Sequence, residues 1–419
     1  MLVVGAGPAG VAAALSASRQ GRSVLLVDSQ GSFGGAATTA YVPCFAPFGD
    51  GVNVLASGIG YEVRKMVSRE VPLDAYWTPL KIEELKRAYD TLIKESTVIC
   101  SLFTTLCDVV SKDGRVEYAV FSAKSGMFAA KAKIYIDCTG DGDLCAYAGA
   151  GFEFGDSDSN VMPATLCSIW SNIDYSKRRG SDDRCLEKAF EDGVFTVCDR
   201  HLPGMQCSDR EKGIGGGNIG HAFGVDPLDE VSLTKAMMDS RKTIEEYGRY
   251  YKEYLSGFED LTLVSSAPAL GVRESRRIVC DYMLSVDDFI NRAVFDDEIG
   301  RYCYPVDIHI MNTDKEEFKR FSDEYHKTLR YGKGESYGIP YRSLTVKGFS
   351  NLLVAGRCLG SDRQMQASVR VMPGCFITGQ AAGVAAALAC ESENVRAFEI
   401  RQLQQRLAEA GAFLPNLEK

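Results

Sequence analysis

Leu2-Val3-Val4-Gly5-Ala6-Gly7-Pro8-Ala9-Gly10 opens with three apolar residues, and its glycines have the spacing G-x-G-x-x-G. Residues 11–17 are small and apolar, so the order strand, tight turn, helix is predicted. Gly5 permits the turn, Gly7 lets the backbone approach a pyrophosphate, and Gly10 lets the helix pack closely on the sheet. Free N–H groups at the start of such a helix bind phosphate oxygens. The stretch therefore predicts a dinucleotide site.

A second predicted strand, residues 23–27, ends at Asp28. This acid lies about 20 residues after the glycines, where a carboxylate binds a ribose hydroxyl and disfavours a 2'-phosphate. A lone G-x-G-x-x-G also occurs in glycine-rich turns of ordinary α/β proteins, but strand, helix and acid in register make that the weaker alternative. The motif does not separate NAD from FAD, so the choice depends on the rest of the chain.

Three further segments bear on this choice: Gly34-Gly35, residues 134–143 and residues 351–357. With the opening motif they resemble the glutathione-reductase-like FAD flavoproteins, in which such segments close around one FAD. More narrowly, the chain resembles the family called FAD-dependent oxidoreductase in residues 162–166, 271–277, 337–342 and 367–373. The resemblance covers nearly the whole chain, and the family name states a cofactor but no substrate.

The resemblance implies FAD as the cofactor and an α/β fold. We expect a Rossmann-like FAD-binding domain, a parallel sheet with a β-meander, built from both chain ends. The residues implied to bind the cofactor are Gly5, Gly7, Pro8, Ala9, Gly10, Asp28, Ser29, Gly34, Gly35, Ala36, Thr38, Leu106, Thr139, Gly140, Asp141, Gly356, Arg357, Gly374 and Gly379.

Pro373 suits a first helical position, and the residues after it are mostly small. In the resembling flavoproteins the start of this helix points at the pyrimidine side of the flavin. Its partial positive charge would stabilise the anion formed when the flavin is reduced. A small-residue core helix without a cofactor role is the alternative.

Residues 1–149 and 339–419 are assigned to the FAD-binding domain, and residues 150–338 to an inserted α+β substrate or cap domain. Helices are predicted at 81–94 and 232–254, and strands within 98–123 around an Asp113-Gly114 turn. The glycine-rich residues 213–220 lack a preceding apolar strand. We therefore predict a flexible loop over the active site there, not a second nucleotide site.

Composition favours an enzyme of the cytoplasm with a small-molecule substrate. The 419 residues include 47 Lys and Arg against 56 Asp and Glu, a net charge of −9, which argues against a nucleic-acid partner. We find no apolar run of about 18 residues for a membrane helix and no signal peptide. The electron acceptor is not identified by the sequence, and a homo-oligomer is an open alternative.

The 14 cysteines form no C-x-x-C pair and no Cys/His cluster with zinc spacing. We therefore predict reduced thiols, no metal and no redox-active dithiol. Cys44 follows Gly35 closely and is a candidate for a covalent flavin bond or a charge-transfer pair, although buried packing is the favoured interpretation.

Three residues are candidates for catalysis: Arg273, His309 and Arg370. If residues 273–277 form a strand, Arg273 shares one face with Ser275 and Arg277, and an arginine facing the flavin would clamp a substrate carboxylate. A structural Arg–Glu network is the alternative. His309 is a candidate proton acceptor because the pKa of histidine lies near neutrality, and Arg370 lies in a family-like segment.

These observations predict an FAD-dependent oxidoreductase that transfers a hydride between a small organic substrate and the flavin. A flavin-bearing tRNA-modification protein is one alternative, because residues 137–143 also resemble those proteins. A non-catalytic flavin electron carrier is another. An NAD dehydrogenase would leave residues 351–373 unexplained.

Overall fold

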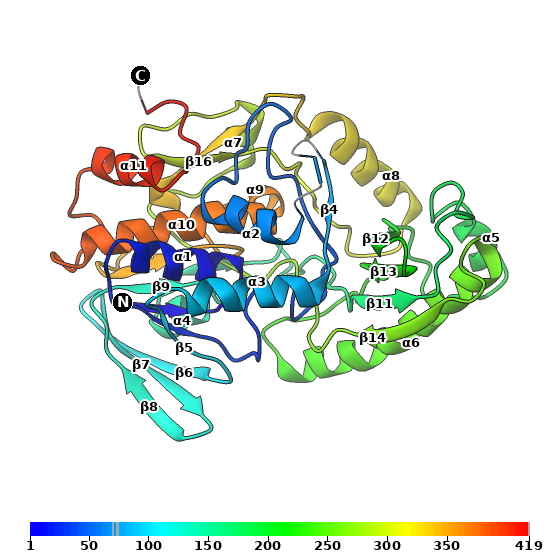
Figure 1. Ribbon diagram of the computed structural model, residues 1–419, viewed down its shortest axis with the longest axis horizontal. Helices are drawn as coiled ribbons and strands as arrows, with labels where there is room; N and C mark the ends of the chain where they lie inside the picture. The colour runs from blue at the N-terminus through cyan, green and yellow to red at the C-terminus, as the bar shows by residue number, and fades with distance from the viewer. Residues whose placement is uncertain (69–70, 73–74, 418–419) are drawn as a thin grey trace.

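A five-stranded parallel sheet forms the centre of the computed structural model, which describes residues 1–68, 71–72 and 75–417. Strands from both chain ends lie side by side in it (Figure 1). In spatial order they are β18 (Leu352–Val354), β9 (Tyr135–Asp137), β1 (Leu2–Val4), β2 (Leu25–Val27) and β5 (Ile99–Ser101). The predicted assembly of one α/β domain from the first and last parts of the chain is therefore confirmed.

Side chains alternate between the two faces of this sheet, as strand geometry requires. Val3, Leu26 and Ile136 belong to the main hydrophobic core, which they share with the helices on one face. Their neighbours Val4 and Tyr135 belong to a second core under the meander on the other face. The helices on the face with the main hydrophobic core are α1 (Pro8–Arg19), α2 (Ile59–Val67), α3 (Ile82–Lys94), α10 (Met372–Ala389) and α11 (Ile400–Glu409).

Helix α10 packs against α1 with almost no space between the two backbones. A Cβ on Gly379 would lie 2.1 Å from the carbonyl oxygen of Ala9, and one on Gly383 would lie 2.2 Å from that of Ala13. By length and composition α10 also meets the criteria for a membrane span, which the sequence analysis did not anticipate, but 94% of it is buried inside the protein. Location in the cytoplasm stays a prediction.

The predicted β-meander covers the other face of the sheet. It comprises β6 (Thr105–Lys112), β7 (Arg115–Ala123) and β8 (Gly126–Ala130), with the short helix α4 (Asp143–Tyr147) beside it. Asp113 and Gly114 both have positive φ, 49° and 72°, as the two central residues of a tight hairpin turn require. The predicted turn between these strands is confirmed.

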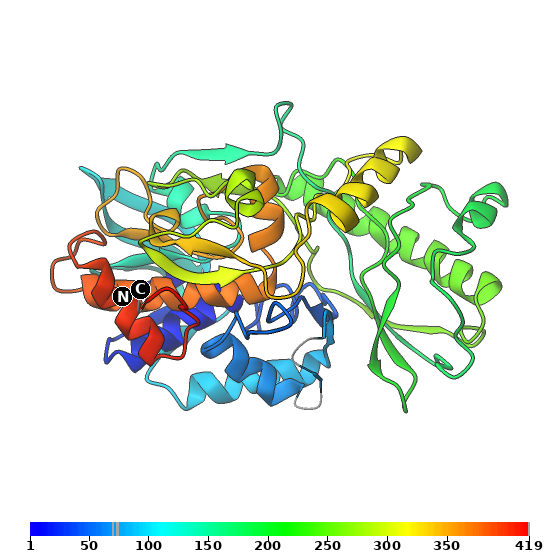
Figure 2. The same ribbon diagram turned by 90° about the horizontal axis from the view of Figure 1, so that it is seen from above.

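The middle of the chain forms a separate lobe with a hydrophobic core of its own, drawn in green in Figure 2. A four-stranded antiparallel sheet lies against the long helix α6 (Glu230–Tyr254). Its strands, in spatial order, are β12 (Met205–Asp209), β13 (Ile214–Gly217), β11 (Ser168–Ser171) and β14 (Thr262–Ser266), and α5 (Leu186–Glu191) also belongs to this lobe.

Shorter elements connect the lobe to the central domain. The remaining strands pair two by two: β3 (Cys44–Phe45) with β4 (Thr78–Pro79), β10 (Phe152–Phe154) with β15 (Arg276–Ile278), and β16 (Glu298–Tyr302) with β17 (Tyr337–Pro340). The remaining helical elements are α7 (Val286–Ile290), α8 (Lys315–Asp323), η1 (Glu324–Thr328), η2 (Tyr341–Ser343) and α9 (Arg363–Val369).

The helices predicted at 81–94, 232–254 and after Pro373 are confirmed as α3, α6 and α10. The flexible loop predicted at 213–220 is wrong, because residues 214–217 form the strand β13. Its glycines permit close packing: a Cβ on Gly216 would lie 2.3 Å from Cβ of Pro43. No parallel strand–helix unit surrounds β13 among the described residues, so the geometry for a second nucleotide site is missing there.

The domain boundaries at residues 150 and 338 stay a prediction. The separate core of the green lobe draws its buried residues from Ala164 to Leu270. Further along the chain, Phe289, Tyr302 and Tyr337 belong to the main core of the central domain. The segment after about residue 276 therefore packs with the central domain more than with the lobe.

Replacement of Gly379 by alanine tests the contact between α1 and α10. The added Cβ would overlap the backbone of Ala9, so we expect the free energy of unfolding to fall by about 1–3 kcal/mol or more. Thermal unfolding of the FAD-loaded protein measures the change. Gly151→Ala is the control, because there the nearest side-chain atoms of Val279 lie 3.7 Å away. Equal melting temperatures for both variants would contradict the inferred close packing.

Candidate active site

A cavity of about 1380 Å³ lies where the parallel strands end. Gly5, Asp28, Cys138 and Gly356 line it, and each closely follows the carboxyl end of β1, β2, β9 or β18. Open α/β sheets bind ligands in the crevice outside these strand ends. Residues of the green lobe line the same cavity, so it joins the dinucleotide motif to the middle of the chain.

The three motif glycines take the positions that their predicted roles require. Gly5 has φ +94°, and a Cβ there would lie 2.3 Å from the carbonyl oxygen of Cys138. At Gly10 a Cβ would lie 1.7 Å from the carbonyl oxygen of Gly5, so the turn and helix pack directly on each other. Gly7 lines the cavity, and apart from its own neighbours along the chain the nearest described atom to its Cβ position is Cα of Gly35, at 4.0 Å. The backbone at Gly7 is therefore open to a phosphate.

Asp28 lies at the edge of the same cavity with its carboxylate held in place. Its Oδ1 accepts a hydrogen bond of 2.7 Å from the backbone of Gln30, and its Oδ2 accepts one from the backbone of Ala6. Burial raises the pKa of Asp28, while these two hydrogen bonds act in the opposite direction. The fixed carboxylate fits the predicted contact with a ribose hydroxyl.

Contacts between Arg357 and the 139–141 segment tie the two ends of the chain together at the cavity. Arg357 Nε donates to the carbonyl oxygen of Gly140 at 2.8 Å, and its Nη2 lies 2.6 Å from Oδ1 of Asp141. Buried Asp137 shapes the turn before them, because it accepts hydrogen bonds from the backbone of Thr139 and Cys145. Burial raises the pKa of Asp137.

Most of the residues implied to bind the cofactor line the cavity. Those that do so are Gly5, Gly7, Pro8, Ala9, Asp28, Ser29, Gly35, Ala36, Leu106, Thr139, Gly140, Asp141, Gly356 and Arg357. The other five, Gly10, Gly34, Thr38, Gly374 and Gly379, lie behind its wall. A Cβ on Gly34 would contact the ring of Tyr89 at 2.5 Å, and one on Gly374 would lie 2.3 Å from the carbonyl oxygen of Val369. Their positions support a packing role.

The fold and the cavity define an FAD-binding flavoenzyme of the α/β class. The chain belongs to the FAD dependent oxidoreductase family, whose model matches residues 1–407. FAD is therefore its cofactor. The cavity-lining residues above fit FAD, because they include a glycine turn, an acid placed to bind a ribose and the start of a helix. A comparison with curated proteins finds no match.

Solved structures with a similar fold include several flavoenzymes. A geranylgeranyl bacteriochlorophyll reductase-like protein from Thermoplasma acidophilum has a TM-score of 0.46 and 13% identity, over 97% of this chain and 81% of that one. The flavin-dependent brominase Bmp2 has a TM-score of 0.46 and 11% identity, over 97% and 82%. The p-nitrophenol 4-monooxygenase from Pseudomonas putida has a TM-score of 0.43 and 11% identity, over 97% and 82%.

All three predicted catalytic residues, Arg273, His309 and Arg370, line the cavity. Arg273 is buried, and its Nη1 donates to the carbonyl oxygen of Pro163 and to Oγ1 of Thr165 at 2.8 and 2.9 Å. Burial and the positive charge of Arg370 lower the pKa of Arg273 to about 10. Both arginines thus line the same cavity, and the charge of Arg370 acts on buried Arg273.

The guanidinium group of Arg370 contacts Asp307 through its Nη2. Its Nη2 lies 3.3 Å from the carbonyl oxygen and 3.7 Å from Oδ2 of Asp307. Its buried Nε has no hydrogen-bond partner among the described residues. Burial alone would raise the pKa of Asp307, but its interactions with His309 and Arg370 lower it. Arg370 therefore lines the cavity with an unpaired, buried Nε.

His309, the predicted proton acceptor, has a polar neighbour at each ring nitrogen. Its Nδ1 lies 2.9 Å from Nε2 of His221, and its Nε2 lies 3.4 Å from Oδ2 of Asp307. Burial, with the charge of Arg273 as the next cause, lowers the pKa of His309 well below its usual value. Both ring nitrogens therefore already face a neighbour, which leaves neither free to accept a proton from substrate. Its role as proton acceptor stays a prediction.

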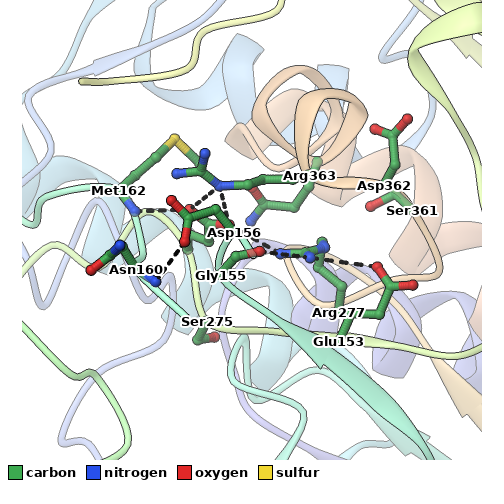
Figure 3. A network of polar contacts seen from close by, with 12 residues as sticks. Glu153, Gly155, Asp156, Asn160, Met162, Ser275, Arg277, Ser361, Asp362 and Arg363 are labelled. Atoms are coloured by element: carbon green, nitrogen blue, oxygen red, sulfur yellow. Dashed lines mark hydrogen bonds and ion pairs between the residues drawn. The ribbon is translucent and has the colours of Figure 1, made fainter. Parts of the chain in front are cut away.

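The predicted shared face of Arg273, Ser275 and Arg277 is not found, because β15 begins only at Arg276. Instead, buried Glu274 accepts hydrogen bonds from Arg277 at 3.0 Å and from Arg363 at 2.9 Å. Figure 3 shows both arginines in this network, which also includes Met162. The Arg–Glu alternative therefore holds for Arg277, while Arg273 lies at the cavity.

Cys44 lines the cavity and is buried. Burial, with Cys167 as a smaller cause, raises the pKa of its thiol to about 12. A neutral thiol is a poor charge-transfer donor and a weak nucleophile. The favoured interpretation of buried packing fits this environment, and a covalent flavin bond stays an untested alternative.

Sequence reasoning missed an aromatic part of the cavity wall. Tyr76, Trp77 and Tyr304 contact one another there, with ring centroids 5.0 to 6.3 Å apart. It also missed His201, which lines the cavity beside His309. These residues lie on connecting segments without periodic patterns, so the sequence carried no motif that singled them out.

Replacement of Asp28 by asparagine tests the ribose contact. The shape of the side chain is kept while its charge is lost, and hydrogen bonds to charged groups contribute about 1.5–3 kcal/mol. We therefore expect the FAD dissociation constant to rise about ten- to a hundredfold, measured by titration of the apoprotein with FAD. Asp113→Asn, in the hairpin turn outside the cavity, is the control. Equal affinity of the two variants would contradict the assigned contact.

Proposed function

We propose that the enzyme oxidises a small organic substrate that carries an anionic group, by transfer of a hydride to the flavin. The observation that carries this proposal is the pair Arg273 and Arg370 on the wall of the FAD cavity. Two like charges in a desolvated site repel each other, and an anion between or beside them relieves this repulsion. A carboxylate or phosphate matches the planar donor fork of arginine.

Arg370 is the better candidate for direct contact with the substrate. Most donors of Arg273 are already used, on Pro163, Thr165 and Asn218. Among the described residues the side chain of Arg370 makes one hydrogen bond, of 3.3 Å to Asp307, and its buried Nε is unpaired. Arg370 also lies two residues before the first residue of α10, the helix end that would support a developing negative charge. Arg273 then fixes the electrostatic environment, and Arg370 binds the anion.

The bound FAD supplies a two-electron acceptor for the substrate's hydride. The chain's own residues bind and orient the substrate and exclude water. Arg370 orients the anionic end, and the aromatic wall of Tyr76, Trp77 and Tyr304 covers the cavity on its apolar side. A fixed substrate pose contributes strongly to rate because it removes the entropy cost of alignment.

The two alternatives make different predictions. A tRNA-modification protein would bind RNA with an affinity that falls steeply with salt, which the net charge of −9 does not favour. A non-catalytic electron carrier would show no reduction of its flavin by small donors and would need a protein partner. Anaerobic mixing of the holoenzyme with small donors, followed by flavin absorbance, separates the proposed oxidation from the carrier function. RNA binding measured at several salt concentrations tests the tRNA-modification alternative.

The anion contact is tested with Arg370→Gln. We expect flavin reduction by small hydroxy acids or amino acids to need about tenfold to a hundredfold more substrate, because a charged hydrogen bond of about 1.5–3 kcal/mol is lost. Flavin reduction by neutral alcohols, which lack the anionic group, should change little. Stopped-flow reduction at several substrate concentrations separates binding from the rate at saturation.

Arg249→Gln is the matched control, since Arg249 lies on an exposed part of α6 and pairs with Glu253. Arg370→Lys keeps the charge but not the planar fork, so it should restore part of the affinity. If Arg370→Gln leaves the preference for anionic donors unchanged, another residue binds the anion. If no small donor reduces the wild-type flavin, the proposed oxidation of a small substrate fails.

A further inference from the structure

Three histidines from three separate connections meet at the cavity. His201 lies between α5 and β12, His221 follows β13, and His309 lies between β16 and α8. One ring nitrogen from each lies within 4.8 Å of those of the other two. His201 and His309 line the cavity itself. The cluster therefore opens toward the space that holds the substrate in the proposed function.

Two carboxylates hold the outer nitrogens of this cluster. His221 Nδ1 lies 3.1 Å from Oδ2 of Asp199, and His309 Nε2 lies 3.4 Å from Oδ2 of Asp307. Asp199 also accepts backbone hydrogen bonds from both His201 and His221, so it fixes the two loops relative to each other. Carboxylates in these positions orient metal-binding histidines, because each ring then points its other nitrogen at the metal.

The buried Nδ1 of His221 has no hydrogen-bond partner among the described residues, although Oδ2 of Asp199 lies 3.1 Å from it. Two neutral imidazoles have one N–H each. When His221 Nε2 and His309 Nδ1 share a hydrogen bond at 2.9 Å and His309 Nε2 faces Asp307, both N–H groups are used and Nδ1 of His221 stays unpaired. If both rings instead direct their N–H groups at the carboxylates, two lone pairs face each other between the rings. A cation between them removes this repulsion.

We propose that His201, His221 and His309 bind one divalent transition metal ion of the zinc class, with a fourth position open to the cavity. Three protein ligands and one open position are the pattern of catalytic zinc sites. Neutral imidazole nitrogens suit Zn²⁺ and its neighbours better than Mg²⁺ or Ca²⁺. Tetrahedral zinc with bonds of about 2.0–2.1 Å holds its nitrogens about 3.3 Å apart. The 2.9 Å contact thus opens by a few tenths of an ångström, and His201 moves inward.

The surroundings of the cluster support a metal in two respects. Asp199 and Asp307 contribute two negative charges, which offset the ion while Arg273 and Arg370 oppose it. Phe318 and Phe321 of α8 contact the ring of His201 at centroid distances of 6.2 and 5.8 Å, and Phe223 contacts His221 at 5.5 Å. Such an apolar shell limits solvent access to a metal and strengthens its interaction with the ligands.

This site goes beyond the proposed oxidation of an anionic substrate, and it departs from the sequence-based prediction of no metal. It also gives His309 a role as a metal ligand instead of a free base. The metal places a Lewis acid at the cavity wall, where the open position faces a substrate oxygen or a water molecule. Metal binding and flavin reduction are measured separately, so either proposal can fail alone.

The test uses the FAD-loaded full chain, stripped of metal with a chelator and then titrated with Zn²⁺ or Co²⁺. We expect one ion per chain, and a Co²⁺ absorption spectrum of tetrahedral nitrogen and oxygen coordination without thiolate charge-transfer bands. His201→Ala and His221→Ala should lose tight binding. Asp199→Asn should weaken it about tenfold to a hundredfold, as loss of a carboxylate partner of a ligand does.

Exposed thiols are the alternative source of bound metal, so Cys100→Ser with Cys107→Ser is the matched control, and this double variant should bind as the wild type does. Retained FAD shows that a histidine variant is folded. If such a variant does not retain FAD, the Co²⁺ spectrum of the wild type decides the question. The site is overturned if the wild type binds no stoichiometric metal or if its Co²⁺ spectrum shows thiolate bands. It is also overturned if the cysteine variant loses the metal while the histidine variants keep it.

Discussion

The close contact between α1 and α10 is the constraint on which the rest of the structure depends. It brings the two ends of the chain together, because Gly379 and Gly383 let the backbone of α10 lie directly on Ala9 and Ala13 of α1. The starts of both helices then reach the same cavity, where Pro8 and Met372 contribute to the wall. A helix start offers free N–H groups and partial positive charge. The site is therefore a consequence of helix packing as much as of the glycine turn.

The cofactor half of the site could be predicted from the sequence because its signals are local. A strand, a glycine turn, a helix and an acid lie within the first 28 residues, and each has its own physical requirement. Gly10 and Gly379 were predicted to bind FAD, whereas the structure places them at packing contacts behind the wall. A sequence shows that glycine stands at a position. It does not show whether a ligand or another backbone lies against it.

The substrate half could not be predicted in the same way. His221 and His309 contact each other across 88 residues, and both lie on connections whose paths depend on how the lobe packs against the central domain. A search for metal-ligand spacing finds pairs a few residues apart and misses such a cluster. The glycines at 214–217 misled the sequence analysis for a related reason: strand β13 has few side chains of its own and depends on its neighbours β11 and β12 for its conformation.

Charge connects the two halves of the site. Arg273 and Arg370 bring two positive charges to this end of the cavity, and Asp199 and Asp307 bring two negative ones. The lowered pKa values of His201 and His309 keep those rings neutral near pH 7. Burial strengthens the interactions among the charged groups, because less water is present to screen them. A metal ion alone would leave this end of the cavity positive, whereas an anionic substrate would offset the charge of the ion. The arrangement therefore favours joint binding of a cation and an anion over either alone, which would place the substrate's reacting end between the metal and the flavin.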